Sequence, residues 1–178
     1  YKLADGIQKI KRQTRQVVAF TSGQGELNPL QTASLENDLS NSYAVNRINL
    51  DSIVQIPSEI KVLIIAKPTE EFSEAHLFML DQYIMNGGHV MFLIDPLIVS
   101  LDSINQNKSY IPPPYNLGLD PLLFKLGARV NPNLVLDLQC PRLPRVGGMH
   151  RYRPKTELFP WYYHTQISTT SERPITKE

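Results

Sequence analysis

A three-layer α/β domain with a mostly parallel sheet is the fold class that the sequence predicts, and three observations lead to it. Two nearly unbroken apolar runs, at residues 61–66 (KVLIIA) and 89–94, are typical of strands covered by helices on both faces. Amphipathic segments with helix-capping residues lie between the strand candidates. The resulting order β-α-β-β-α-β favours right-handed crossovers within a single sheet.

The clearest unit runs over residues 73–96 and combines a helix, a glycine stop and a buried strand. Ser73 is a good N-cap, and Gly87 supplies the left-handed residue that ends a helix without steric strain. The apolar positions that recur on one face of this helix are Leu77, Leu80 and Ile84. We therefore expect a helix that leads directly into a central strand at residues 89–94.

The remaining elements follow from caps, prolines and alternation. Asn28 as N-cap and Pro29 at the first helical position begin a helix that runs to about residue 41. The other predicted elements are a short N-terminal helix over 1–14, a brief helix over 122–126, and strands at 16–20, 43–50 and 134–138. We expect a flavodoxin-like strand order, 2-1-3-4, with a fifth strand at one edge.

The chain divides into a predicted α/β domain over residues 1–138 and an irregular tail over 139–178. The tail is too rich in proline for a regular helix and too aromatic for simple disorder. The chain also begins without Met and ends without a capping element, which is typical of an excised fragment. We expect the tail to pack on a neighbour or to continue into a further part of the protein.

Composition excludes several classes of protein. The chain has 178 residues, 42% of them hydrophobic, which suffices for one domain with a core, and its formal charge of +1 gives no reason to expect nucleic acid. The single Cys140 cannot form an internal disulfide. No apolar run is long enough to span a bilayer, so we expect the chain itself to be soluble.

Polar side chains follow three of the predicted strands at the edge where α/β sheets bind ligands. Gln24 and Glu26 follow the first strand, Lys67 follows the third and Asp95 follows the fourth, so these four residues are the candidate ligand-binding set. Glu26 and Asp95 can meet there as a carboxylate pair for acid/base chemistry. Alternatively, Glu26 caps the following helix region and Asp95 accepts backbone N–H bonds in its own turn.

Known catalytic and cofactor motifs are absent from the sequence. The turn at 23–25 lacks the third glycine of a dinucleotide site, and no Lys-Ser or Lys-Thr completes a phosphate loop. No nucleophile elbow is present, because Cys140 stands between Gln139 and Pro141. The four histidines have no metal-ligand spacing. We therefore expect no catalytic residue, cofactor or metal.

The aromatic run of the tail is a second candidate surface. Trp161, Tyr162 and Tyr163 are consecutive and lie between prolines. Such side chains can stack on a sugar ring or pack against a partner protein. Proline-broken aromatic segments at a chain end also allow exchange between protomers, so the sequence is compatible with a homodimer.

Several segments together resemble the GldG family, the auxiliary, substrate-binding-like subunits of an ABC transporter linked to gliding motility and protein secretion in Bacteroidetes. They are GQGEL at 23–27, LDQYIMNGGHVMFLIDPLIVSLDS at 80–103, LDPLLFKLGARVNPNLVLDLQC at 119–140, LFPWYYHT at 158–165 and PITK at 174–177. The match follows the right order over nearly the whole chain, and the block at 119–140 is specific.

The resemblance implies a membrane-anchored protein of the inner (cytoplasmic) membrane, with a large extracytoplasmic, periplasmic part of which this chain is the middle. It implies an ABC permease and its ATPase as partners. It also implies a domain similar to one of intraflagellar-transport proteins and, distantly, to class I glutamine amidotransferases. No amidotransferase cysteine stands at an elbow here, so no catalytic residue is carried over.

Two hypotheses about function follow. The first is a non-enzymatic extracytoplasmic module that binds a ligand or partner proteins and couples an ABC transporter to a gliding or secretion apparatus. The second is a carbohydrate-binding or hydrolase domain that uses Glu26 and Asp95, which requires these carboxylates to lie within about 5 to 10 Å of each other in an open cleft.

Overall fold

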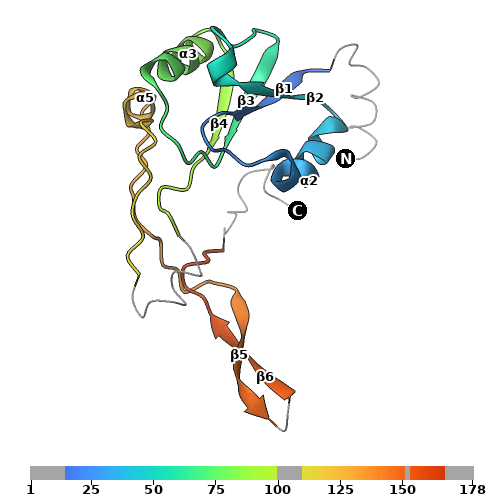
Figure 1. The fold of residues 1–178 in the computed structure, drawn as a ribbon, viewed down its shortest axis with the longest axis vertical. Coiled ribbons are helices and arrows are strands. Elements are labelled where there is room, and N and C mark those ends of the chain that lie inside the picture. The colour runs from blue at the N-terminus through green and yellow to red at the C-terminus, as the bar shows by residue number, and fades with distance from the viewer. Residues whose placement is uncertain (1–14, 100–109, 151–152, 167–178) are drawn as a thin grey trace, which may run out of the picture. The chain divides into compact units, whose positions relative to one another are not determined.

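The computed structural model describes residues 15–99, 110–150 and 153–166 (Figure 1). The chain forms two compact units, Tyr1–Pro132 and Asn133–Glu178. The first contains the parallel sheet and its helices, and the second contains an antiparallel hairpin. The predicted helix over 1–14 lies outside the described residues.

The first unit is built on a four-stranded sheet with the order β2-β1-β3-β4. Its strands are β1 (Val17–Ser22), β2 (Ala44–Asn49), β3 (Ile60–Ala66) and β4 (His89–Leu93). All three pairings are parallel. The predicted α/β class and the flavodoxin-like 2-1-3-4 order are therefore confirmed, since contiguous apolar runs do mark strands buried inside a parallel sheet.

Two helices begin at reciprocal capping boxes. In α2 (Pro29–Ser40), Asn28 Oδ1 accepts from the backbone N–H of Gln31, and Gln31 Oε1 accepts from that of Asn28, both at 3.0 Å. In α3 (Glu74–Met85), Ser73 and His76 exchange the corresponding pair of hydrogen bonds at 3.3 Å. These bonds satisfy donors that a helix N-terminus leaves free.

The sheet separates two apolar clusters, and α3 and α2 lie on its opposite faces (Figure 1). The larger cluster includes Leu63 and Ile65 of β3 and Leu80 of α3, all fully buried. It also takes in side chains from the short helices η1 (Leu50–Ser52) and α5 (Asp120–Lys125). The smaller cluster joins β1 and β3 to Leu39 of α2.

The second unit differs from the irregular tail that the sequence predicts. Strands β5 (Arg142–His150) and β6 (Arg153–Pro160) pair as an antiparallel hairpin. Prolines in it are tolerated because a two-stranded ribbon has a free outer edge on each strand, where no N–H donor is needed. The register shifts between Val146 and Gly148, as at a β-bulge.

The predicted fifth strand at 134–138 is not formed in the structure. The Asp137 carboxylate accepts a hydrogen bond from the backbone N–H of Gln139 at 3.0 Å, which turns the chain locally. Its apolar side chains, Leu134, Val135, Leu136 and Leu138, are exposed. The apolar run was therefore a poor guide to pairing at this position.

Candidate functional site

The turn after β1 is the centre of the polar network at the carboxyl ends of the strands. Gln24 is buried, with 3% of its surface exposed. Its carbonyl accepts hydrogen bonds from the backbone N–H groups of Thr69 and Glu70, both at 3.0 Å, and its Nε2 donates to Asp51 Oδ2 at 3.4 Å. The turn is thereby tied to the loops that follow β2 and β3.

A buried histidine joins the same network from the start of α3. His76 Nδ1 accepts from the backbone N–H of Ser73, so the proton of a neutral ring stands on Nε2. That nitrogen lies 3.0 Å from Asp51 Oδ1 and donates to it. Because both ring nitrogens are engaged, His76 serves as a structural link between Asp51 and the helix rather than as a free base.

Two glycines let the surrounding side chains approach the turn closely. Gly23 and Gly25 have positive φ angles of 118° and 70°. A Cβ atom at Gly23 would lie 2.7 Å from Asp51 Oδ2, and one at Gly25 would lie 2.0 Å from Thr69 Oγ1. The space that a phosphate would need in a glycine-rich cradle is thus filled by the protein's own side chains.

Two oxygen atoms in the turn lack partners. Glu26 Oε2 accepts from the backbone N–H of Gln24 at 2.8 Å, whereas Glu26 Oε1 and Gln24 Oε1 are buried without a hydrogen bond to any described residue. Both unpaired atoms are acceptors, so a molecule that satisfied them would have to present donors.

The other two candidate residues form a separate pair. Lys67 Nζ lies 3.3 Å from Asp95 Oδ2, and both side chains are largely exposed. Lys67 also has a positive φ of 52°, which places its backbone in the sharp turn that ends β3. Contacts thus join Gln24 to Glu26 and Lys67 to Asp95, while no interaction found among the described residues joins Glu26 to Asp95.

Sequence reasoning missed Asp51 and His76, which are central to the network. Asp51 lies in η1, two residues after the end of β2, so the same strand-end rule that selected Gln24 would have selected it. His76 gave a weaker signal, because a histidine in the first turn of a helix is commonly exposed, and only the folded chain brings it to Asp51.

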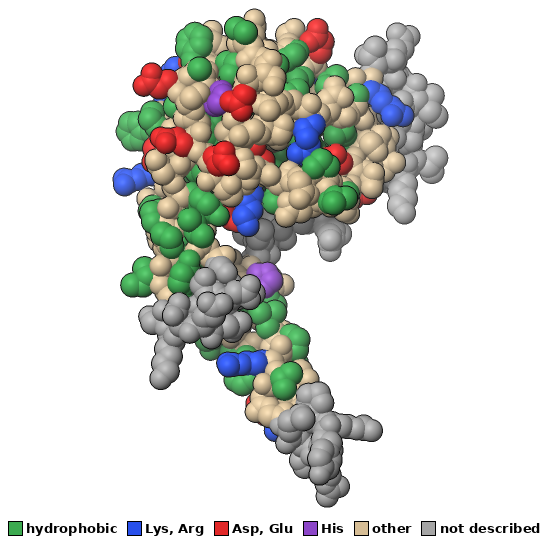
Figure 2. All heavy atoms as spheres, in the orientation of Figure 1, with side chains coloured by type: hydrophobic (Ala, Val, Ile, Leu, Met, Phe, Trp, Pro, Cys, Tyr) green, Lys and Arg blue, Asp and Glu red, His purple; other side chains and the backbone are tan. Residues whose placement is uncertain are grey.

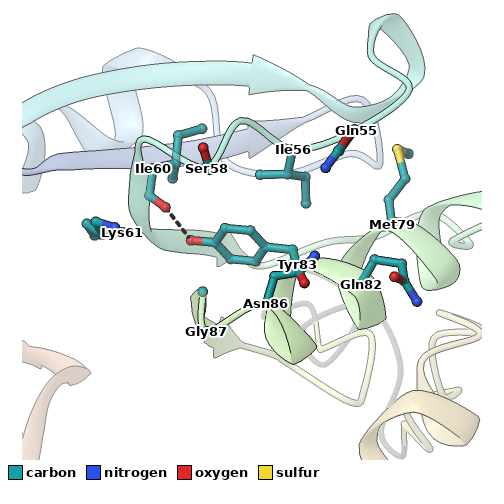
Figure 3. Close-up of a pocket in the computed structure, with 11 residues that line it drawn as sticks. Gln55, Ile56, Ser58, Ile60, Lys61, Met79, Gln82, Tyr83, Asn86 and Gly87 are labelled. Atoms are coloured by element: carbon teal, nitrogen blue, oxygen red, sulfur yellow. Dashed lines mark hydrogen bonds between the residues drawn. The ribbon is translucent and has the colours of Figure 1, made fainter.

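A small hollow of about 70 Å³ opens at the opposite end of the sheet, where β3 and β4 begin (Figure 3). Figure 3 shows the Tyr83 hydroxyl directed at the carbonyl oxygen of Ile60, to which it donates at 3.0 Å. Burial raises the pKa of Tyr83 above its usual range. The hollow has room for water, and Lys61 is the charged residue among those that line it.

Two further hollows flank α5, with volumes of about 300 and 470 Å³. The first is lined mainly by apolar residues, among them Ile94, Leu117 and Leu123. Figure 2 shows acidic and basic side chains interspersed over the visible face of the first unit, without a large patch of either sign. The first hollow therefore offers mainly apolar contact, whereas the second is lined by Asp120 and Arg129 in addition to apolar residues.

The aromatic residues lie beside the base of the hairpin. The Trp161 and Tyr163 rings meet edge to face at 6.1 Å between centroids, and the carbonyl of Tyr162 accepts a hydrogen bond from Asp137. Tyr162 and Tyr163 are exposed, whereas Trp161 is half-buried. Trp161 thus helps to hold the base together, and the two tyrosines present aromatic surface.

Within the ranges that the structure describes, no group of three or more His, Cys, Asp or Glu residues is arranged to hold a metal ion. None of the described helices combines the length and the apolar character needed to cross a bilayer.

The family described as "ABC-type uncharacterized transport system" matches residues 15–178. No curated protein is significantly similar in sequence. Among solved structures, the chain is similar to the mmIFT52 N-terminal domain, with 18% identity and a TM-score of 0.46, covering 82% of this chain and 65% of that one. The chain thus spans somewhat under two thirds of the length of that structure.

Proposed function

Because the chain belongs to the family of ABC-type uncharacterized transport systems, we propose that it is a non-catalytic, extracytoplasmic module of such a system. In this proposal the module binds the permease of the transporter, through which it associates with the ATPase, and couples the transporter to a gliding or secretion apparatus. The full-length protein is then anchored in the inner membrane, as in the GldG family that the sequence resembles.

The observation that carries this proposal is the exposed apolar surface of the hairpin together with that of Tyr162 and Tyr163, which follow its second strand. Val146 and Leu158 are 62% and 61% exposed. They lie on the same face of the ribbon, because Leu158 is paired with Pro144 and Val146 is two residues along the strand from Pro144. Leu143 and Phe159 pair on the other face and are also exposed. A two-stranded hairpin is marginally stable alone in water, so a covering partner would stabilise it.

The contacts of the strand-end network favour a structural role for its residues over a catalytic one. His76 has no free nitrogen, Glu26 is held by its own turn, and Asp95 is paired with Lys67. A carboxylate pair for hydrolysis needs one group with a perturbed pKa and one positioned opposite it. We therefore propose that the candidate ligand-binding residues, Gln24, Glu26, Lys67 and Asp95, hold this edge of the sheet together.

Co-purification tests the proposed partner surface. We expect the full-length protein to retain its permease when wild type and to lose it when Tyr162 and Tyr163 are both replaced by alanine, because their exposed rings supply apolar contact. The complex is expected to weaken at least about tenfold. The measurement is the amount of permease recovered with the tagged protein from detergent-solubilised membranes.

A matched control is Phe78→Ala, which removes an exposed aromatic ring from α3 instead. It should leave recovery of the permease unchanged. Equal recovery with the double tyrosine variant, or equal loss with Phe78→Ala, would place the interface elsewhere and contradict the proposal.

The carboxylates give a second prediction. Glu26→Gln and Asp95→Asn are expected to leave permease binding and transporter-linked function intact within about twofold, since neither group acts as an acid or base. Motility or secretion in a strain that carries each variant provides the measurement. Abolished function with normal protein levels and normal permease binding would instead support the hydrolase alternative.

A further inference from the structure

Strand β4 forms one edge of the sheet, and its outer side has no backbone partner among the residues that the structure describes. Its sequence, HVMFL, contains no proline and no Lys, Asp or Glu. Natural sheets usually prevent an edge strand from pairing with another chain by means of proline or charged residues, a β-bulge or a segment that covers the edge.

The backbone groups that point outward can be assigned from one hydrogen bond. The carbonyl of Leu93 accepts from the backbone N–H of Lys67 at 2.8 Å, so it faces inward, toward the neighbouring strand β3. Since these groups alternate in direction along a strand, those of Val90 and Phe92 face outward. The edge therefore offers two donors and two acceptors.

The side chains of β4 alternate between a covered and an uncovered face. Val90 and Phe92 pack against the core cluster beneath α3. Met91 and Leu93 point the other way and are 50% and 40% exposed. The cluster beneath α2 contains residues of β1, β2 and β3 and none of β4, so α2 does not cover this apolar pair.

We propose that β4 pairs with β4 of a second copy of this chain, antiparallel, around a two-fold axis that passes between the two Met91 residues. In this register, Val90 of each copy exchanges both backbone hydrogen bonds with Phe92 of the other. The two four-stranded sheets then join as one continuous sheet. The proposal is independent of the function proposed above.

The strand itself favours a second copy as the occupant. A two-fold axis requires a self-complementary surface, and the outward groups of Val90 and Phe92 lie symmetrically about Met91. The strand carries no Lys, Arg, Asp or Glu, so no like charges oppose each other across the pairing.

Polar side chains at the ends of the strand also complement each other. In this register, His89 of one copy stands opposite Leu93 of the other. Phe92 and Ile94 both pack against the core cluster, so the residues that alternate with them, Leu93 and Asp95, lie on the other face of the strand. The imidazole of His89 is thereby a diagonal neighbour of the other copy's Asp95 carboxylate, which can accept its N–H. Two such pairs form in each dimer.

Cysteine cross-linking tests directly which residues face each other across the proposed β4–β4 pairing. In a Cys140→Ser background, which removes the native thiol, Met91→Cys is expected to give a disulfide-linked dimer. The two Cα atoms of a non-hydrogen-bonded antiparallel pair lie about 4.5 Å apart, within the roughly 4.4 to 6.8 Å that a disulfide spans. Mixed His89→Cys and Leu93→Cys chains are expected to cross-link to each other for the same reason.

Leu93→Cys alone is the matched control. Leu93 stands opposite His89 of the second copy, so the two Leu93 residues are four positions apart along the strand. This separation is about 13 Å, which is too far for a disulfide. Sedimentation equilibrium of the same chains gives the oligomeric state without oxidation. We expect a dimer that Met91→Lys weakens at least about tenfold, because like charges then face each other on the axis.

Met85→Lys, on the exposed face of α3, should leave the dimer unchanged. Circular dichroism identical to wild type shows that each variant is folded. A monomer throughout the micromolar range, a dimer that Met91→Lys does not weaken, or cross-linking of Leu93→Cys alone as efficient as that of Met91→Cys would each overturn the proposal. A partner from the transporter bound at β4 of a monomeric chain would overturn it too.

Discussion

Replacement of Gly88 by alanine is expected to lower the free energy of unfolding by roughly 2 to 4 kcal/mol. A Cβ atom at this position would lie 2.3 to 2.5 Å from three ring carbons of Tyr83. The Tyr83 ring is buried and its hydroxyl donates to the carbonyl of Ile60, so any movement away from the new methyl group breaks this bond (Figure 3). Urea denaturation of both proteins measures the change.

A double-mutant cycle distinguishes this clash from a backbone effect. Tyr83→Leu removes the ring carbons that the methyl group meets, so Gly88→Ala should become nearly neutral in that background. Gly87 is the matched control, because its φ is 88° and nothing lies within 4 Å of its missing Cβ. Gly87→Ala should cost about 1 to 2 kcal/mol in both backgrounds. An equal effect of Gly88→Ala in both backgrounds would contradict the packing explanation.

Arg47→Met is expected to lower the free energy of unfolding by roughly 2 to 3 kcal/mol. The Arg47 guanidinium donates to the carbonyl of Leu27 at 2.9 Å and to Thr32 Oγ1 at 2.8 Å, and it forms an ion pair with Glu36. It also lies over the Phe20 ring, 5.5 Å from its centroid. These contacts fasten α2 to the sheet, and methionine retains only the apolar stem.

Arg15→Met is the control for the loss of a positive charge. Arg15 is exposed and makes one long hydrogen bond of 3.3 Å, to the carbonyl of Ser40, so its replacement should change the free energy of unfolding by less than about 0.5 kcal/mol. Chemical denaturation of the two variants at neutral pH provides the comparison. If the two variants lowered the free energy of unfolding equally, the contacts of Arg47 would contribute no more to stability than the interactions of its side chain with water in the unfolded chain.

The same cluster gives a dependence on pH. A hydrogen bond from Thr32, together with Arg47, lowers the pKa of Glu36 below its usual range. A carboxylate with a lowered pKa in the folded state contributes stability above the unfolded value of about 4.3, and this contribution is lost as pH falls through the folded pKa. Glu36→Gln should therefore be destabilising at pH 7 and nearly neutral at about pH 2. A constant difference across this range would contradict the assignment.

The sheet was predictable because burial on both faces leaves a direct trace in the sequence. The strands at 61–66 and 89–94 are contiguous apolar runs, and Gly87 marks the end of the helix between them. The hairpin was missed because proline argues against a strand that is paired on both sides, and the sequence does not show that these two strands are each paired on one side only. Its register depends on cross-strand pairs that no local pattern encodes.

The polar network was only partly predictable, for a related reason. The strand-end rule selected Gln24 and Glu26, which share one turn and are joined by a hydrogen bond. The link from Asp51 to His76 depends on how the loop after β2 meets the start of α3, which only tertiary packing determines. Contacts between distant loops carry no periodic signal in the sequence.

Helix α3 is fixed at both ends by residues of neighbouring loops and strands. At its start His76 is bound to Asp51, and near its end Tyr83 is bound to the carbonyl of Ile60. The two anchoring residues are about 10 Å apart along the helix axis, and they reach opposite ends of the sheet because Asp51 lies after the end of β2 whereas Ile60 begins β3. A displacement of the loop after β2 would therefore be passed through the helix to Ile60, the first residue of β3, unless one of the two hydrogen bonds breaks.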